Sequence, residues 1–217
     1  MHDTVMTKRH PRWRLFAAPV LLLCAAIAWS GFWFYAASQV DVQFDGWKAR
    51  EAKSGRTYEC ANKSVAGFPF RMEVTCADPV VTLASQMPGQ IASGVKLKAQ
   101  LKSILVLAQI YDPTKIIAEF KGPALVGSGN GAASYSANWS VGRASAAGLP
   151  LIPQRVSFAF DSPSLDRFDN GAQMPLFRAS HLELHTRLAE GSVTDNPVID
   201  TAFELSSSTV QGLHPIL

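Results

Sequence analysis

The chain has 217 residues, of which 47% are hydrophobic, and it carries a formal net charge of +3. Four of the 20 basic residues and one of the 17 acidic residues lie in the first 37 positions, so the remainder carries 16 of each. A neutral remainder has no basic field to hold nucleic acid, and the sequence contains no nucleic-acid-binding motif. The composition therefore excludes the common nucleic-acid-binding classes and allows one moderate domain behind an apolar N-terminal segment.

The most apolar segment covers residues 15–37, and no charged residue occurs between Arg14 and Asp41. A helix of this length spans about 35 Å, enough for a hydrocarbon layer of about 30 Å. Basic residues next to a membrane span stay in the cytoplasm. Here the preceding basic residues are Lys8, Arg9, Arg12 and Arg14. We therefore expect a cytoplasmic N-terminus over residues 1–14, a transmembrane helix over residues 15–37, and the rest of the chain on the far side of the membrane.

Two other interpretations of the apolar segment stay open. A cleaved signal peptide has a shorter apolar region and a small-residue cleavage site, which Ala36 and Ser38 resemble weakly. A lipoprotein signal would place a lipidated cysteine after small residues, whereas Cys24 follows three leucines in the middle of the segment. The length of the segment favours a retained anchor over both.

After the anchor, residues 38–54 are expected to continue as a juxtamembrane helix, with Phe44 and Trp47 on one face and Gly55 as the stop signal. From residue 55 to residue 217 the pattern changes to short alternating segments separated by Gly and Pro. This pattern predicts a mainly β fold, formed by a meandering antiparallel β-sheet that we expect to be curved.

Cys60 and Cys76 flank a Gly67-Phe68-Pro69-Phe70-Arg71 string that has the composition of a turn. A hairpin folded at Phe68 places Cys60 opposite Cys76, within reach of a disulfide bond. An even pair of cysteines in an oxidising compartment points the same way, although two buried thiols are the alternative. We expect the string to be structural, with Phe68 and Phe70 directed into the core.

The clearest two-sided strand covers residues 95–102. Val95, Leu97, Ala99 and Leu101 alternate strictly with Lys96, Lys98, Gln100 and Lys102. The apolar side chains Val95, Leu97 and Leu101 are therefore candidates for a face that contacts lipid. The alternative is that residues 132–205 form a second sheet layer, which would give a sandwich with no room for a ligand.

Side chains capable of catalysis or metal binding form no familiar motif in this sequence. His181, Glu183 and His185 alternate along one strand face, where a metal site would need a further ligand. Asp161, Asp166 and Asp169 lie in a stretch expected to be a solvated loop, without the ligand spacing of a calcium loop. We therefore expect no enzyme activity, no cofactor and no metal.

Several features together resemble a known family. They are the charged N-terminus, the single apolar segment, Trp47, and the Gly-Phe-Pro-Phe-Arg string between two cysteines, followed later by Ile110-Tyr111-Asp112-Pro113. Over about residues 12–217 the chain resembles the bacterial domain-of-unknown-function family 2125, whose members are usually longer. The resemblance implies an inner-membrane protein with a periplasmic domain, here shortened or an N-terminal part. It implies no activity and no site residue.

The combination of one anchor with a β-sheet is also similar, more loosely, to AsmA-like envelope proteins linked to lipid movement. We therefore expect a lipid-handling or envelope-maintenance module whose partners are the bilayer and phospholipid or envelope proteins, and not nucleic acid. The alternative is a non-catalytic structural or interaction module that docks envelope partners.

Overall fold

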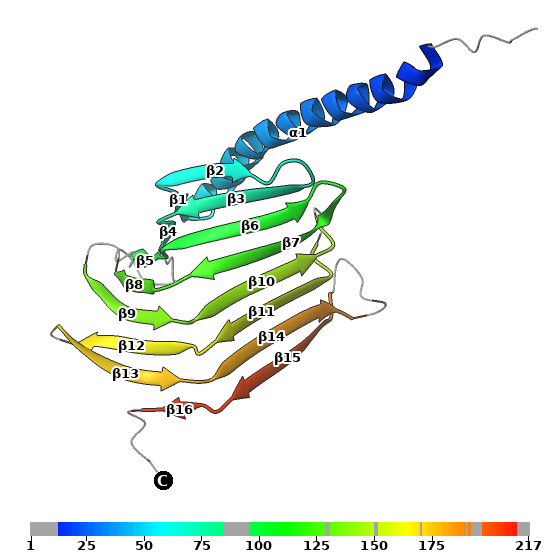
Figure 1. The fold of residues 1–217 in the computed structure, drawn as a ribbon. Coiled ribbons are helices and arrows are strands. Elements are labelled where there is room, and N and C mark those ends of the chain that lie inside the picture. Colours follow the sequence, from blue (N-terminus) through cyan, green and yellow to red (C-terminus); the bar gives the residue numbers. More distant parts are fainter. Residues whose placement is uncertain are drawn as a thin grey trace, which may run out of the picture.

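The computed structural model contains one helix and 16 strands in the part of the chain that it describes (Figure 1). The described residues are 13–84, 96–128, 131–149, 152–169, 171–189, 191 and 197–211, with side chains from residue 16 onward. The elements are α1 (Trp13–Lys53), β1 (Arg56–Glu59), β2 (Asn62–Ala66), β3 (Arg71–Ala77), β4 (Val80–Ala84), β5 (Lys96–Gln100), β6 (Ser103–Gln109), β7 (Asp112–Lys121), β8 (Ala124–Ser128), β9 (Ala133–Asn138), β10 (Val141–Ala147), β11 (Arg155–Asp161), β12 (Ser164–Asp169), β13 (Ala172–Arg178), β14 (His181–Leu188), β15 (Ile199–Ser206) and β16 (Thr209–Val210).

Helix α1 is continuous over 41 residues, so the expected anchor and the expected juxtamembrane helix are one element. It ends where Gly55 adopts a left-handed conformation with φ of 75°, which glycine tolerates without a steric penalty. Within the described residues, it is the one helix long and apolar enough to cross a membrane. Its apolar N-terminal part extends away from the sheets, and its C-terminal part lies against them (Figure 1).

The strands form two eight-stranded sheets in which every neighbouring pair is antiparallel. The order is β1-β4-β5-β8-β9-β12-β13-β16 in sheet A and β15-β14-β11-β10-β7-β6-β3-β2 in sheet B. The prediction of a mainly β, meandering antiparallel fold is therefore confirmed. The expected single sheet is divided into two, and its curvature stays a prediction.

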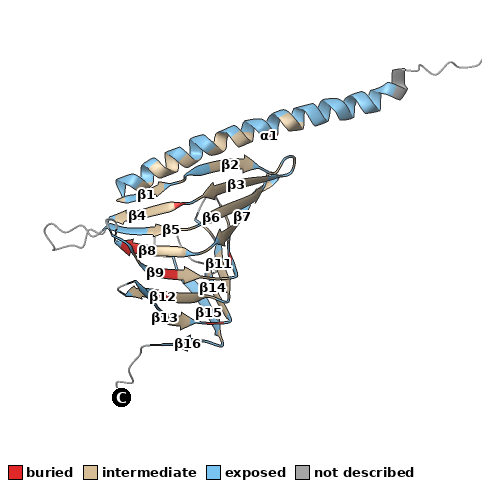
Figure 2. Cartoon of the chain, turned by 60° about the vertical axis from the view of Figure 1, so that its left-hand side comes forward, coloured by how far each residue is buried: buried red, intermediate tan, exposed pale blue. Residues whose placement is uncertain are grey.

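Two-residue corners join the sheets. Each passage of the chain between the sheets uses two residues, and the eight corners are residues 60–61, 78–79, 101–102, 122–123, 139–140, 162–163, 179–180 and 207–208. Corner residues Asp78, Ser162 and Ser207 have positive φ, and prolines follow the first two of them. As a result, the two sheets meet at an angle along the line of the corners (Figure 2).

Few side chains of the described residues are buried. The buried apolar residues of the described part are Trp33, Pro79 and Ala179, and most strand residues are half-buried or exposed (Figure 2). The alternative of a sandwich closed by residues 132–205 is wrong, because the strands of that stretch are distributed over both sheets. The described part of the chain therefore has large sheet surfaces and a thin core.

Candidate functional site

The register of sheet B places apolar side chains on one face across all its central strands. Residues paired across an antiparallel ladder project from the same face, and alternate residues along a strand project from opposite faces. Phe158, for example, pairs with Ala144 on one side and Leu184 on the other. The residues of this face are Val74, Cys76, Ile104, Val106, Ala118, Phe120, Ala144, Phe158, Phe160, Leu182, Leu184, Phe203 and Leu205.

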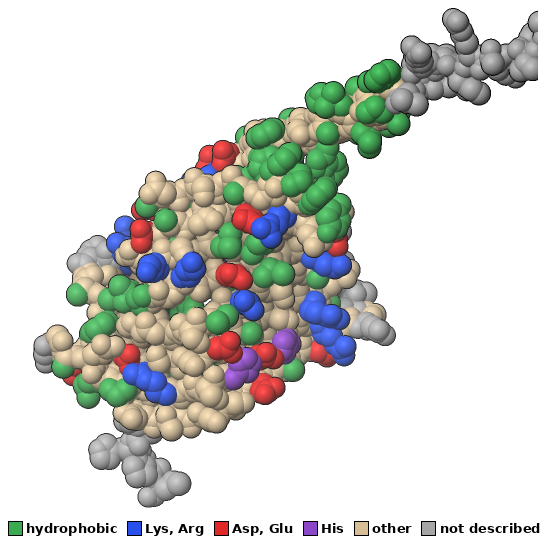
Figure 3. Space-filling model, in the orientation of Figure 1, with side chains coloured by type: hydrophobic (Ala, Val, Ile, Leu, Met, Phe, Trp, Pro, Cys, Tyr) green, Lys and Arg blue, Asp and Glu red, His purple; other side chains and the backbone are tan. Residues whose placement is uncertain are grey.

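The opposite face of sheet B carries most of the charged and polar side chains, together with Leu105, Leu107 and Ile117. The ladder places Glu119 beside Arg143, with 3.3 Å between carboxylate and guanidinium, and Arg187 beside Asp200 at 3.0 Å. Figure 3 shows charged and His side chains distributed over this side of the molecule with hydrophobic side chains among them, whereas the exposed part of α1 is mainly hydrophobic. Sheet B thus separates an apolar face from a solvated face.

Sheet A has a similar but less complete division, since Arg56 aligns with Leu83 and Arg167 with Tyr135 on the apolar side. The ladder aligns Val81 with Ala99, Ala99 with Val126, and Val126 with Tyr135. The apolar residues are Tyr58, Val81, Leu83, Leu97, Ala99, Val126, Tyr135, Ala137, Leu165, Phe177 and Val210. We use "the apolar face" for this set together with the set on sheet B.

The candidate lipid-facing residues of the sequence fall in three places. Leu97 belongs to the apolar face of sheet A, and Lys98 beside it in the chain belongs to the other face. Leu101 lies in a corner, where its N–H donates to the carbonyl of Pro79 at 3.0 Å, so the strand alternation ends before it. Val95 lies outside the described residues. Contact of these residues with lipid stays a prediction.

Helix α1 covers only one end of the apolar face. Phe44 and Trp47 of α1 lie over an apolar cavity of about 260 Å³, whose other walls include Tyr58 and Val81 of sheet A and Ile104 of sheet B. Trp47 contacts Tyr58 with 4.4 Å between ring centroids. Because both sheets line this one cavity, their apolar faces converge beneath the helix. Further along the strand order, the apolar face includes the exposed side chains Leu97, Tyr135, Phe203, Leu205 and Val210.

A lysine on this face is neutralised by the helix. Lys63 forms an ion pair with Asp41 at 2.6 Å and lies over the Phe44 ring, 4.8 Å from its centroid. The stem of Lys63 can therefore cover apolar surface while its ammonium is paired. This contact helps to fix α1 on the first strands of both sheets.

The disulfide between Cys60 and Cys76 is confirmed, but the expected register is wrong. Lys63, not Cys60, is the ladder partner of Cys76. Cys60 lies in the corner that takes the chain from β1 in sheet A to β2 in sheet B. The bond therefore fastens the first corner to strand β3, which the hairpin argument did not foresee.

The Gly67–Arg71 string forms the tip between β2 and β3, as expected, but its aromatic rings do not enter a core. Phe68 and Phe70 are 51% and 61% exposed. Each contacts α1 instead, with ring centroids 5.6 Å apart for Phe68 and Trp33 and 6.1 Å apart for Phe70 and Trp29. A sequence argument that considers only the hairpin cannot find this contact, because its partner lies far away in the chain.

The histidines of β14 join a hydrogen-bonded row on the polar face. His181 contacts Asp161 at 2.7 Å and Glu183 at 2.9 Å, and His185 contacts Glu183 and Ser157, both at 2.9 Å. Hydrogen bonds that His181 donates to the carboxylates of Glu183 and then Asp161 raise the pKa of His181 above its ordinary value of 6.5. Hydrogen bonds from His185 and then His181 lower the pKa of Glu183 below 4.5. No group of side chains in the described residues has the arrangement of a metal site.

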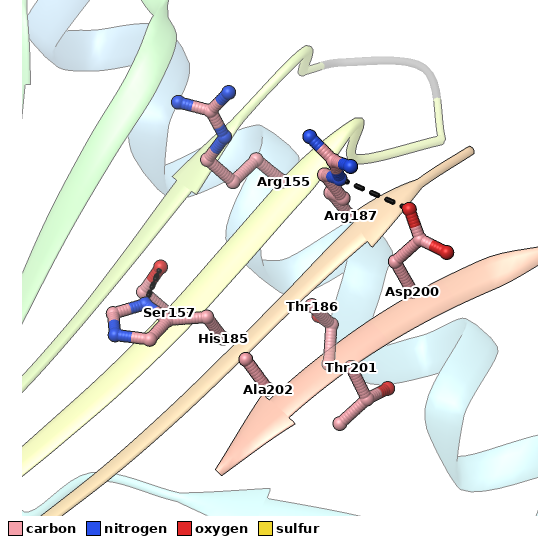
Figure 4. Close-up of a pocket in the computed structure, with 8 residues that line it drawn as sticks. All are labelled: Arg155, Ser157, His185, Thr186, Arg187, Asp200, Thr201 and Ala202. Atoms are coloured by element: carbon pink, nitrogen blue, oxygen red, sulfur yellow. Dashed lines mark hydrogen bonds and ion pairs between the residues drawn. The ribbon is translucent and has the colours of Figure 1, made fainter. Parts of the chain in front are cut away.

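A hollow of about 690 Å³ lies beside this row (Figure 4). Ser157 and His185 lie at one end, and Arg155, Arg187 and Asp200 lie at the other. Ser157, His185 and Glu183 form a hydrogen-bonded series reminiscent of a nucleophile with its base, but His185 and Ser157 lie on the open face of a sheet. The backbone N–H groups around Ser157 serve the strand ladders, which leaves none of them to stabilise an oxyanion.

The acidic stretch expected to be a solvated loop is largely strand β12. Asp166 is only 3% exposed, and its carboxylate pairs with Arg178 at 2.6 Å and accepts a hydrogen bond from Gln173 at 2.7 Å. The expectation of a solvated loop is wrong for this residue, because neighbouring strand β13 supplies both partners. Asp166 therefore has a structural role in sheet A.

The fold and the apolar face define a class of protein: a β-sheet domain preceded by one long apolar helix. More particularly, the chain belongs to the family described as "Uncharacterized protein conserved in bacteria (DUF2125)", whose model matches residues 33–215. Comparison with curated proteins and with solved structures gives no match. The similarity to AsmA-like envelope proteins therefore stays a prediction.

Proposed function

We propose that α1 anchors the chain in a bacterial inner membrane and that the apolar face binds phospholipid acyl chains in the periplasm. The observation that carries this proposal is the continuous apolar face across both sheets, which α1 covers at one end only. Large uncovered apolar surfaces are unusual in stable monomers and mark binding surfaces. Transfer of acyl chains onto this face would be favourable by about 0.8 kcal/mol per buried CH₂.

Redox state and charge support the periplasmic placement. The Cys60–Cys76 disulfide fits an oxidising compartment, which the periplasm is and the cytoplasm is not. The four basic residues before the apolar segment favour retention of the N-terminus in the cytoplasm. Both arguments favour the same side of the membrane for the sheets.

The proposed role is binding without catalysis. The Ser157–His185–Glu183 series lies on the polar face, whereas the proposed lipid lies on the opposite face of the same strands. A reaction at Ser157 would therefore take place across the sheet from the bound acyl chains. This separation favours a lipid-handling or envelope-maintenance role over a lipase role.

The second candidate function is a docking module for envelope proteins. Strand β15 is an edge of sheet B within the described residues, and seven of its eight residues are exposed. An exposed edge strand offers unpaired backbone groups to which a partner can add a strand. Phe203 and Leu205 of β15 also belong to the apolar face, whereas Leu97 lies in sheet A, so the Leu97 substitution is the one that separates the two functions.

Counting of bound lipid tests the proposal. The full chain would be purified in mild detergent, and retained phospholipid would be counted by native mass spectrometry for the unmodified chain and for Leu97→Asp and Phe203→Asp. We expect both substitutions to remove bound phospholipid, because each places a carboxylate on the apolar face. The matched control is Lys98→Asp, which changes the polar face of the strand that carries Leu97.

Equal retention by all of these folded variants would contradict lipid binding on the apolar face. If the chain instead bound an envelope protein, and variants with a disrupted β15 bound less of it, the docking module would be the better account.

A further inference from the structure

The tip between β2 and β3 is fastened to α1 by two indole groups. Trp29 donates its indole N–H to the carbonyl of Pro69 at 2.8 Å, and Trp33 donates to the carbonyl of Arg71 at 3.1 Å. Trp33 is only 5% exposed, which makes it one of the few buried apolar residues in the described part of the chain. A buried indole needs a partner for its N–H, and here both partners are backbone carbonyls of the tip or next to it.

Aromatic rings surround these two hydrogen bonds. Phe68 packs edge-on against Trp33 and stacks on Phe34 at 6.1 Å, while Phe70 lies 6.1 Å from Trp29. The next hairpin is joined to the tip, since the N–H of Ile110 donates to the carbonyl of Phe70 at 3.1 Å. We use "the aromatic collar" for the rings of this region: Trp29, Phe32, Trp33, Phe34, Tyr35, Phe68, Phe70 and Tyr111.

The outer side of the collar is uncovered. Phe68 and Phe70 are more than half exposed, Tyr111 is 67% exposed, and Phe32, Phe34 and Tyr35 on α1 are exposed as well. Solvated apolar rings of this number are costly, whereas a membrane interface accepts both the apolar ring and a polar edge. The tip contributes no ionic side chain before Arg71, which pairs with Glu73.

The position of the aromatic collar along α1 indicates its depth in the bilayer. From Phe16 to Trp33 the helix rises by about 26 Å, close to the thickness of a hydrocarbon layer of about 30 Å. With the basic N-terminus inside, Trp29 to Tyr35 lie at the outer surface of that layer. Phe68 and Phe70 contact this same part of the helix.

We propose that the β2–β3 tip enters the outer interface of the bilayer, so that Phe68, Phe70 and Tyr111 contact phospholipid directly. The proposal rests on the anchoring role proposed for α1, and the bilayer is the occupant because the collar is continuous with the exposed apolar part of that helix. This second contact holds the first strands of both sheets beside the membrane. Lipid would then reach the apolar face from that end.

Depth-dependent quenching tests this placement with the full chain in phospholipid vesicles. Cys24 is the free thiol of the described residues, so an environment-sensitive fluorophore on Cys24 reports the span itself. In a Cys24→Ala background, the same fluorophore would be placed by Phe70→Cys, by Tyr111→Cys, or by Ala172→Cys. Ala172 is an exposed residue next to a hairpin turn of sheet A and provides the matched control.

Vesicle lipids carrying a nitroxide near the headgroup end of the acyl chain should remove most of the fluorescence at positions 70 and 111 and little at position 172. Aqueous iodide should give the opposite order. Strong quenching at Cys24 by a second nitroxide lipid labelled deep in the acyl chain, without quenching of positions 70 and 111 by the shallow nitroxide, would overturn the proposal and leave the anchor standing. Protection of positions 70 and 111 from iodide without nitroxide quenching would also overturn the proposal, since a protein would then cover the collar. Absence of quenching at Cys24 would overturn the anchor as well.

Discussion

Phe158 and Leu184 lie opposite each other on β11 and β14, while the residues before and after them in the chain, Ser157 and His185, pair on the other face through a 2.9 Å hydrogen bond. The same two strands therefore present an apolar pair to one side and a polar pair to the other. This division continues across sheet B and underlies the proposed lipid-binding role. It also supplies matched positions for experiments, since adjacent residues report opposite faces.

Substitution of Leu184 distinguishes an open apolar face from a packed core. Leu184 is half-buried, so Leu184→Ala should lower the free energy of unfolding of the lipid-free chain by about 1 kcal/mol. A leucine in a closed core would cost about 2–5 kcal/mol. Chemical denaturation of the full chain in detergent would measure the difference, with His185→Ala as the control on the polar face. A loss in the range of a packed core would contradict the open face.

Removal of the disulfide should weaken the first corner without affecting the anchor. In the chain-entropy model, a bond that closes a loop with a sequence separation of 16 residues stabilises by roughly 3 kcal/mol. Cys60→Ala and Cys76→Ala should therefore each lower the free energy of unfolding by that amount, and the double substitution should add little. Cys24→Ala is the control, because Cys24 is exposed on α1 and unpaired. Equal stability of all three single variants would contradict a structural role for the bond.

The His181 and Glu183 pair predicts a pH-dependent contribution to stability. His181 has a raised pKa, so its contribution is fully present below 6.5 and declines as the pH rises through its folded-state value. Glu183 has a lowered pKa, so its contribution is present above 4.5 and declines as the pH falls through its folded-state value. The difference in melting temperature between the unmodified chain and His181→Gln should therefore be largest between about pH 4.5 and 6.5.

Thermal unfolding over a pH series would measure that difference. High salt provides the control, because both groups are partly exposed to solvent and their interaction is weakened at high ionic strength. A melting-temperature difference that stays constant from acid to alkaline pH would show that the ionisation of this pair does not stabilise the fold.

Reporter fusions address the proposed orientation. Alkaline phosphatase fused after Leu217 should be active, because this enzyme needs an oxidising compartment, whereas a reporter that works only in the cytoplasm should be inactive there. Replacement of Lys8, Arg9, Arg12 and Arg14 by acidic residues should reduce the phosphatase activity, since basic residues set the orientation. Activity of the cytoplasmic reporter in the unmodified fusion would reverse the assignment.

Local patterns in the sequence predict the fold class well but not the division into two sheets. The alternation of Leu97 and Ala99 with Lys98 fits the faces of β5. It continues without a break to Leu101, which lies in a corner. Alternation of apolar and polar residues does not reveal where the chain passes from one sheet to the other, because an apolar residue in a two-residue corner can continue the alternation of the strand before it. The paired cysteines were likewise found from the sequence, while the position of Cys60 in a corner between the two sheets was not.

Candidate site residues were harder to predict than strands. The apolar face joins residues from β1 to β16, and register between distant strands has no local signal. Phe68 and Phe70 were expected in a core because apolar rings in a tight turn usually pack inward. Their partners are Trp29 and Trp33 of α1, a contact that only the tertiary structure brings about. The aromatic crowding at the end of the apolar segment was the one available signal.

The most direct test of the central claim is photo-crosslinking of lipid in living cells from adjacent positions on β11. A photoreactive amino acid would replace Phe158 on the apolar face in one variant and Ser157 on the polar face in the other, with radiolabelled phospholipid in the membrane. We predict a lipid adduct from position 158 and none from position 157. Equal labelling at both positions, or no adduct from position 158 in a folded chain, would contradict lipid binding by the apolar face.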